Sequence, residues 1–180
     1  PEAVAAMQEV ERVGKALGKP EDPALLHNAT GLFNYMQDWP KAVAYGERAV
    51  KAWDAKPKPG LARAEVLNNL GAAYMGAGQR ERAEAVYREA LASARANGQP
   101  VGVSLNNIAD VLQQTGRQRE ALPLLAEAAA EFERDGSIPE AAIVYSNIGA
   151  NHADLGQRAA AASAFARSLA LFKQSDNVPR

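Results

Sequence analysis

The chain has 180 residues, of which 47% are apolar and 6% aromatic, and it contains no cysteine. Such a chain can bury a sizeable core, and its many alanines favour closely packed helices over a sheet. Its net charge of −1 supplies no basic stripe, so neither nucleic acid nor a membrane surface is the expected partner.

Several features missing from the sequence bear on the cellular location of the protein and on the ends of its chain. Without cysteine there are no disulfides or thiolate metal sites, and we take the cytoplasm as the default location. No charged leader precedes an apolar stretch and no run of about 18 apolar residues occurs, so we expect neither a signal peptide nor a membrane span. The chain begins at Pro1 rather than Met, which indicates a fragment of a longer protein or a processed one.

One pattern recurs along the chain, and its fixed point is an asparagine between apolar residues. The separations are 69−28 = 41, 107−69 = 38 and 147−107 = 40, so the unit is close to 40 residues long. We refer to these four residues as the asparagine ladder: Asn28, Asn69, Asn107 and Asn147. We predict a single repeat domain over residues 1–180, with the second helix of a preceding unit at 1–18 and helix-pair units at 22–60, 61–100, 101–139 and 140–180.

Each unit is predicted to be a pair of helices. Its first apolar set recurs at i, i+3, i+4 and i+7, which is one face of a helix, and a second such set follows a break. The break is marked by Gly78, Gly116 and Gly156, and glycine readily takes the left-handed conformation that closes a helix. Proline or glycine follows each second helix. An all-α fold is therefore expected.

The second unit shows the signature most clearly, in the segment 67–71 (Leu-Asn-Asn-Leu-Gly) with Tyr74, followed by Ala83, Tyr87 and Ala90. It resembles the tetratricopeptide repeat, and the 40-residue period is similar to the longer, kinesin-light-chain-like variant. The first unit departs from the pattern at Thr30, Gln37 and Gly46. The resemblance implies a right-handed α-solenoid, or superhelix, of antiparallel helix pairs, and a binding scaffold rather than an enzyme.

The asparagine ladder points away from the packing seam. At about 100° per residue, Asn69 lies roughly 200° from both Leu67 and Gly71. By resemblance, this side of the first helix lines a concave groove. Asparagine is a poor helix-interior residue, but its carboxamide can pair with the main chain of an extended peptide. The predicted groove residues are Asn28, Tyr35, Asn69, Asn107, Asp110, Gln114, Asn147 and Asp154.

Two other interpretations of the ladder stay open. Each asparagine could instead bond to a neighbouring helix or its own backbone and set the pitch of the solenoid. One amide per repeat also superficially suits one RNA base per repeat, but the predicted groove contains acids and no lysine or arginine. His27 and His152 stand in different units without a second ligand at metal-binding spacing, and no catalytic or nucleotide-binding motif occurs. We therefore expect no cofactor, no metal and no catalytic residues.

The sequence predicts a protein–protein interaction or scaffold module, part of a larger bacterial regulatory or scaffolding protein, that holds an extended peptide or partner segment in the groove. The alternative is a peptide-sensing regulatory domain of a bacterial signalling or transcription-regulator protein. Enclosing a short peptide requires more repeats than this chain contains, and that distinguishes the two.

The C-terminal helix carries apolar residues with nothing after them to pack against. Leu169 and Phe172 hold the slots in which Val50 and Trp53 are expected to pack on the following unit. With Leu171, they predict either more chain in the parent protein or self-association through this end.

Overall fold

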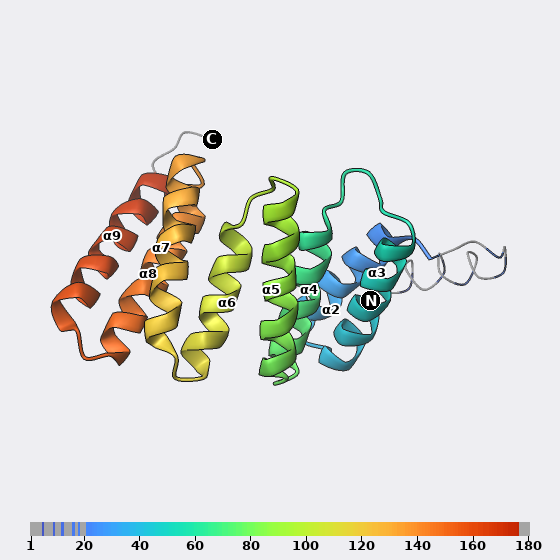
Figure 1. The fold of residues 1–180 in the computed structure, drawn as a ribbon, viewed down its shortest axis with the longest axis horizontal. Coiled ribbons are helices and arrows are strands. Elements are labelled where there is room, and N and C mark those ends of the chain that lie inside the picture. The colour runs from blue at the N-terminus through green and yellow to red at the C-terminus, as the bar shows by residue number, and fades with distance from the viewer. Residues whose placement is uncertain are drawn as a thin grey trace. The chain divides into compact units, whose positions relative to one another are not determined.

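The computed structural model describes residues 21–176, together with Ala5, Glu9, Arg12 and Ala16, which are helical, and Gly18. The predicted helix at 1–18 therefore lies mostly outside the described residues. Between residues 21 and 176 all regular structure is helical, so the predicted all-α class is confirmed (Figure 1). The helices are α2 (Pro23–Tyr35), α3 (Trp39–Ala55), α4 (Arg63–Gly76), α5 (Arg80–Ala96), α6 (Gly102–Gln114), α7 (Gln118–Arg134), α8 (Ile138–Asp154) and α9 (Arg158–Asp176).

The described helices alternate between two roles. We call α2, α4, α6 and α8 the first helices, and α3, α5, α7 and α9 the second helices. The described residues divide into two compact units between Ala94 and Arg95. From here on, the first unit and the second unit mean these two compact units, and each helix pair is called a repeat. No described helix is long and apolar enough to cross a membrane.

Aspartate and proline start the first two described helices. Asp22 Oδ1 accepts a hydrogen bond from the Ala24 N–H at 2.8 Å, and Asp38 Oδ1 accepts one from Lys41 N–H at 3.4 Å. Proline stands in the first turn of each helix, where its missing N–H would have no partner in any case. The starts of α2 and α3 are thus determined locally.

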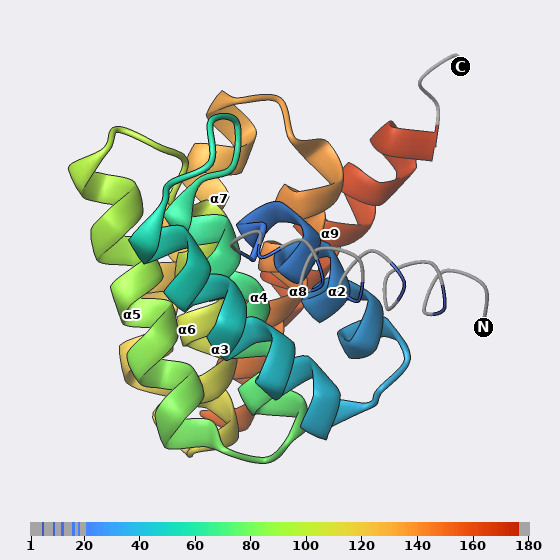
Figure 2. The ribbon, with the colours of Figure 1, turned by 90° about the vertical axis from the view of Figure 1, so that its right-hand side faces the viewer.

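In the first unit, α4 packs against both α2 and α3. Phe33 lies in a buried cluster with Ala29, Ala42 and Ala73. Small residues bring the helices close, because a β-carbon at Gly71 would overlap the ring of the buried Tyr87. The connection over 56–62 forms a long loop between α3 and α4 (Figures 1 and 2), and it is tied to α3 by Trp53 Nε1, which donates to the Leu61 carbonyl at 3.1 Å.

In the second unit, α6 packs on α7, α7 on α8, and α8 on α9. Leu171 is 2% exposed and lies in a buried cluster with Ala141 and Ala142. The prediction that Leu171 belongs to an uncovered apolar end is therefore wrong. Leu171 is two residues from Leu169, so it lies about 200° around the helix and faces the interior of its own unit. Leu169 and Phe172 are 56% and 40% exposed, as expected.

Left-handed glycines close the first helices, as predicted. Gly78, Gly116 and Gly156 have φ values of 74°, 78° and 72°. In the first described repeat, between α2 and α3, the equivalent turn position is occupied by Gln37, whose φ is 58°. It is the one described non-glycine residue with a positive φ, and its backbone keeps the shape of the turn although the sequence departs from the pattern.

Candidate functional site

The first helices carry the predicted binding residues, and in the first unit these differ in exposure. Asn28 is exposed on α2, and Tyr35, at the C-terminal end of the same helix, is 88% exposed. Asn69 on α4 is half-buried. The large exposed ring of Tyr35 gives this unit an accessible aromatic contact surface.

Asn69 is tied to the neighbouring first helix. Its Nδ2 lies 3.3 Å from His27 Nδ1, and its backbone carbonyl accepts a hydrogen bond from Asn34 Nδ2 at 2.9 Å. Burial lowers the pKa of His27, against the opposing effect of the Glu65 charge. A neutral imidazole can accept the bond from the Asn69 amide, whereas a protonated one cannot.

In the second unit the predicted residues form two stripes. On α6, Val103, Asp110 and Gln114 are exposed and fall within about 40° of one another around the helix, with half-buried Asn107 on the same side. Gln114 Nε2 donates to both oxygens of Asp110, at 3.2 and 3.1 Å. The stripe on α8 consists of Ile143, Asn147, Ala150 and Asp154.

Hydrogen bonds hold the two stripes side by side. Asn147 Nδ2 donates to Asn106 Oδ1 at 2.8 Å, and Gln113 Nε2 donates to Asp154 Oδ2 at 3.3 Å. Both pairs are 41 residues apart, so α6 and α8 are parallel and in register. The α6–α8 face is defined here by these two stripes. Its amides and carboxylates lie on two neighbouring parallel helices.

Asn151 completes the seam between α6 and α8. It is fully buried, and its Nδ2 donates to Gln113 Oε1 at 3.1 Å and to the Asn147 carbonyl at 2.8 Å. Its Oδ1 accepts no hydrogen bond among the described residues. A buried carbonyl oxygen without a donor is uncommon in folded proteins.

Sequence reasoning missed the partners of the ladder as site residues. They lie next to a ladder asparagine or one to two helical turns after it, and a single repeat considered alone does not reveal their contacts. The signal was present in the repeat offset, since the partner of each bond lies about one period earlier. The missed residues are His27, Asn34, Asn106, Gln113 and Asn151.

These bonds support the structural role that the sequence left open, at least for Asn69 and Asn147. These bonds do not use all the hydrogen-bonding capacity of either side chain, because a carboxamide has two donor hydrogens and two acceptor lone pairs. One bond to a neighbouring helix leaves further positions for a ligand. The same contact also fixes the orientation of the amide before any ligand arrives.

Charge is divided unequally between first and second helices. The helices α2, α6 and α8 contain no lysine or arginine, and α4 has only Arg63. Arg63 is neutralised by Asp54 and Glu89, each at 2.7 Å. The cations of the described helices therefore lie almost entirely on the second helices.

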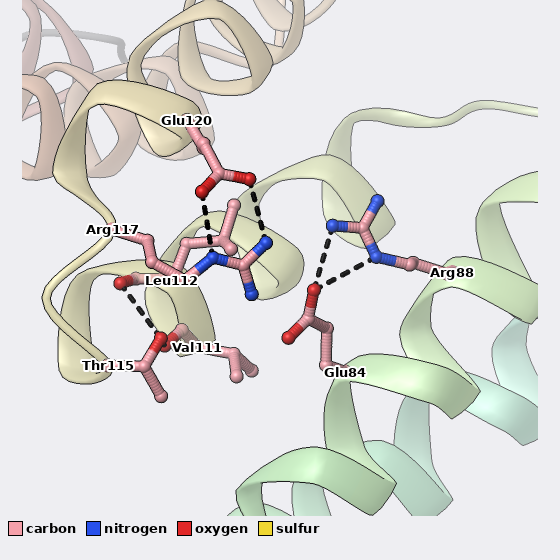
Figure 3. Close-up of polar contacts among 7 residues, drawn as sticks. All are labelled: Glu84, Arg88, Val111, Leu112, Thr115, Arg117 and Glu120. Atoms are coloured by element: carbon pink, nitrogen blue, oxygen red, sulfur yellow. Dashed lines mark hydrogen bonds and ion pairs between the residues drawn. The ribbon is translucent and has the colours of Figure 1, made fainter.

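Arginines of the second helices and turns form ion pairs close by. Arg88 meets Glu84 one turn earlier on α5 at 2.8 Å, and Arg117 meets Glu120 at the start of α7 at 2.7 Å (Figure 3). Thr115 Oγ1 donates to the carbonyls of Val111 and Leu112 at the end of α6 (Figure 3). These groups are occupied by local contacts, as expected of solvated turns. Within the described residues no cluster of three histidine, aspartate or glutamate side chains could hold a metal ion.

Paired antiparallel helices, glycine-closed turns and a polar face on every other helix define a helical-repeat scaffold. The tetratricopeptide repeat profile matches residues 21–96 and 100–174, so the chain belongs to the tetratricopeptide repeat family. The suspected resemblance is confirmed. Among curated protein sequences none matches this chain significantly.

Solved structures share the fold at low identity. Aspartyl phosphate phosphatase F from Bacillus subtilis is 19% identical with a TM-score of 0.79, covering 98% of this chain and 50% of that chain. The putative kinesin light chain repeats of Podosopora anserina are 20% identical with a TM-score of 0.78, covering 98% and 88%. A Rap protein complexed with Competence and Sporulation Factor is 16% identical with a TM-score of 0.79, covering 98% and 50%. This chain thus spans half the length of two of these proteins.

Family membership places the chain among protein–protein interaction modules. Repeats of this class stack helix pairs and use the resulting extended surface for binding. The exposed polar residues of the first helices are the candidates for partner binding.

Proposed function

We propose that this chain binds an extended peptide or partner segment on the first-helix surface that carries the asparagine ladder. The observation that supports this most is the arrangement of Asn147 on the α6–α8 face. Its amide is fixed by Asn106 at 2.8 Å and lies in one stripe with exposed Ile143 and Asp154. A carboxamide held in this way can pair with a peptide main chain without reordering its own side chain.

The test separates the two roles of Asn147 by comparing it with its own partner. Asn147→Ala and Asn106→Ala both remove the same hydrogen bond, but only Asn147 lies on the predicted ladder. We expect both variants to lose a similar, small amount of thermal stability. Asn147→Ala should in addition weaken peptide binding about tenfold, the scale of one or two lost hydrogen bonds, whereas Asn106→Ala only frees the Asn147 amide to reorient and should weaken binding less.

The probe is a peptide selected by the wild-type chain from a phage-displayed random library, labelled and titrated by fluorescence anisotropy. Equal loss of affinity in both variants would show that the bond matters only through helix geometry. Unchanged affinity in Asn147→Ala would contradict the proposed role of the ladder.

A peptide-sensing regulatory domain is the second candidate. It is supported by the fold shared with the Rap protein solved with Competence and Sporulation Factor. This candidate requires a short free peptide to be bound by the complete parent protein. The peptide-sensing candidate would be favoured if a free pentapeptide bound with the same affinity as the same five residues within a longer chain.

We also propose that chains associate through α9. Leu169 and Phe172 are exposed, and Phe165 one to two turns earlier is 43% exposed. Together they give the last helix an apolar surface of the kind that interfaces use.

A further inference from the structure

We propose that the α6–α8 face selects partner segments in which an apolar residue is followed, three to five residues away, by lysine or arginine. This inference rests on the proposed function and names the chemical class of the partner. It is carried by the order of side chains along the two stripes and by the distribution of charge in the second unit.

The apolar part of the α6–α8 face lies at the N-terminal ends of its helices. Val103 is 50% exposed in the first turn of α6, and Ile143 is 48% exposed in the second turn of α8. They are 40 residues apart and hold the same position in successive repeats. Two exposed branched side chains on neighbouring parallel helices form a contact surface for one apolar side chain of a partner.

The acidic part lies at the opposite ends of the same helices. Asp110 on α6 and Asp154 on α8 are both exposed. Each is bonded to a glutamine amide rather than to a cation, by Gln114 at 3.1 Å and Gln113 at 3.3 Å. The carbonyl ends of the helix dipoles lie at this end and add negative potential.

A separate observation at this end concerns a buried oxygen. Asn151 Oδ1 has no donor among the described residues, and Gln113 joins the Asn151 side chain to Asp154. The buried Asn151 side chain thus holds Gln113, which in turn holds the Asp154 carboxylate in place. The solvent-facing carboxylates of Asp110 and Asp154 favour a ligand that brings N–H donors and positive charge.

Most carboxylates of the second unit that lie outside α6 and α8 already form an ion pair. Elsewhere in the unit, Arg95 pairs with Glu127, Arg134 with Asp135 and Arg167 with Glu133. By contrast, no carboxylate of α6 or α8 forms an ion pair among the described residues, and neither helix contains lysine or arginine. On the α6–α8 face, Asp110 and Asp154 are thus exposed carboxylates without an ion pair, whereas Glu131 of α7 is buried and accepts a hydrogen bond from the Val101 N–H at 2.8 Å.

Helix geometry gives the spacing. At a rise of about 1.5 Å per residue, Val103 and Asp110 are separated by roughly 10 Å, and Ile143 and Asp154 by roughly 16 Å. An extended peptide advances about 3.3 Å per residue, so these separations correspond to three to five peptide residues. The Asn107 and Asn147 amides lie between the two ends, where the main chain of such a peptide would pass.

The experiment uses three sets of fluorescein-labelled peptides made of glycine and serine with a single leucine. Three, four or five residues after the leucine they carry arginine, glutamine or glutamate. We expect the arginine peptides to bind the 180-residue chain most tightly, and their affinity to fall as salt is raised. Asp110→Asn with Asp154→Asn should weaken their binding by up to about fivefold, the scale of the one exposed ion pair that each peptide's arginine forms.

The matched control is Glu120→Gln with Glu127→Gln, which removes the same charge from exposed positions on α7 and should leave affinity unchanged. Circular dichroism melts of both double variants check that they fold. Equal weakening by the two double variants would show a general charge effect and overturn the inference. Preference for glutamate peptides, with binding still lost in Asn147→Ala, would overturn the inference but leave the proposed function standing. Failure of every peptide to bind at about 1 mM would contradict both.

Discussion

Gln37 is strained by the turn that it closes. Its φ of 58° is a conformation that glycine adopts at the equivalent positions of the later repeats. A side chain in this region costs about 1 kcal/mol or more, which replacement by glycine would remove. Part of the stability gained in this way is lost again, because glycine also makes the unfolded chain more flexible. We expect Gln37→Gly to raise the free energy of unfolding by roughly 0.5 kcal/mol, measured by urea denaturation. A loss of stability would show that the Gln37 side chain makes a compensating contact.

His27 couples stability to pH through its contact with Asn69. Burial lowers its pKa in the folded chain, so the unfolded chain binds the proton more readily. The stabilising contribution is present above the unfolded value of about 6.5 and is lost as the pH falls through the lowered folded value. We therefore expect the melting temperature to fall between pH of about 7.5 and about 5, and to fall less in His27→Gln. Parallel curves for the two proteins would contradict this linkage.

At the scale of single elements, α7 contains a proline where the helix needs an N–H. Pro123 lies inside the helix, exposed on its surface, and cannot donate to the carbonyl of Arg119. We expect Pro123→Ala to raise the free energy of unfolding by about 2 kcal/mol, from the restored hydrogen bond and better helix propensity. Urea denaturation measures this. Ala126→Gly, at an exposed position one turn later, is the opposite control and should destabilise by about 1 kcal/mol.

Two elements also show how a shared residue pattern produces different local roles. Asn69 and Asn147 occupy equivalent positions, yet one contacts a histidine and the other an asparagine on the preceding first helix. The pattern predicts that an amide stands at each position. The partner depends on which residue the neighbouring helix places opposite it.

At the scale of the whole molecule, the apolar face of α9 is expected to drive association. Replacing Leu169 and Phe172 with glutamine removes exposed apolar area without touching the buried Leu171. In sedimentation velocity runs at increasing concentration, the wild-type chain should form larger species and the double variant should remain monomeric. Ser163→Gln, exposed on the opposite side of α9 from Phe172, is the control and should behave as wild type. A wild-type chain that stays monomeric would contradict the proposal.

The fold was largely predictable from the sequence because its signals are local and repeated. The glycines at 78, 116 and 156 close their helices with positive φ, as their positions in the period require. Leu171 was assigned incorrectly because it adjoins two exposed apolar residues in sequence. Its burial depends on the direction of the side chain around α9, and so on where α8 lies.

The amino-acid sequence by itself determined the helices, their pairing and the recurrence of the asparagine, because periodicity and glycine turns act over a few residues. It also determined that α6 and α8 carry acids and no lysine or arginine. Only the tertiary structure decided that Asn106 and Gln113 hold these helices in register and that Asn151 is buried between them. Those contacts join residues about 40 positions apart, and their geometry exists only once the helices have packed.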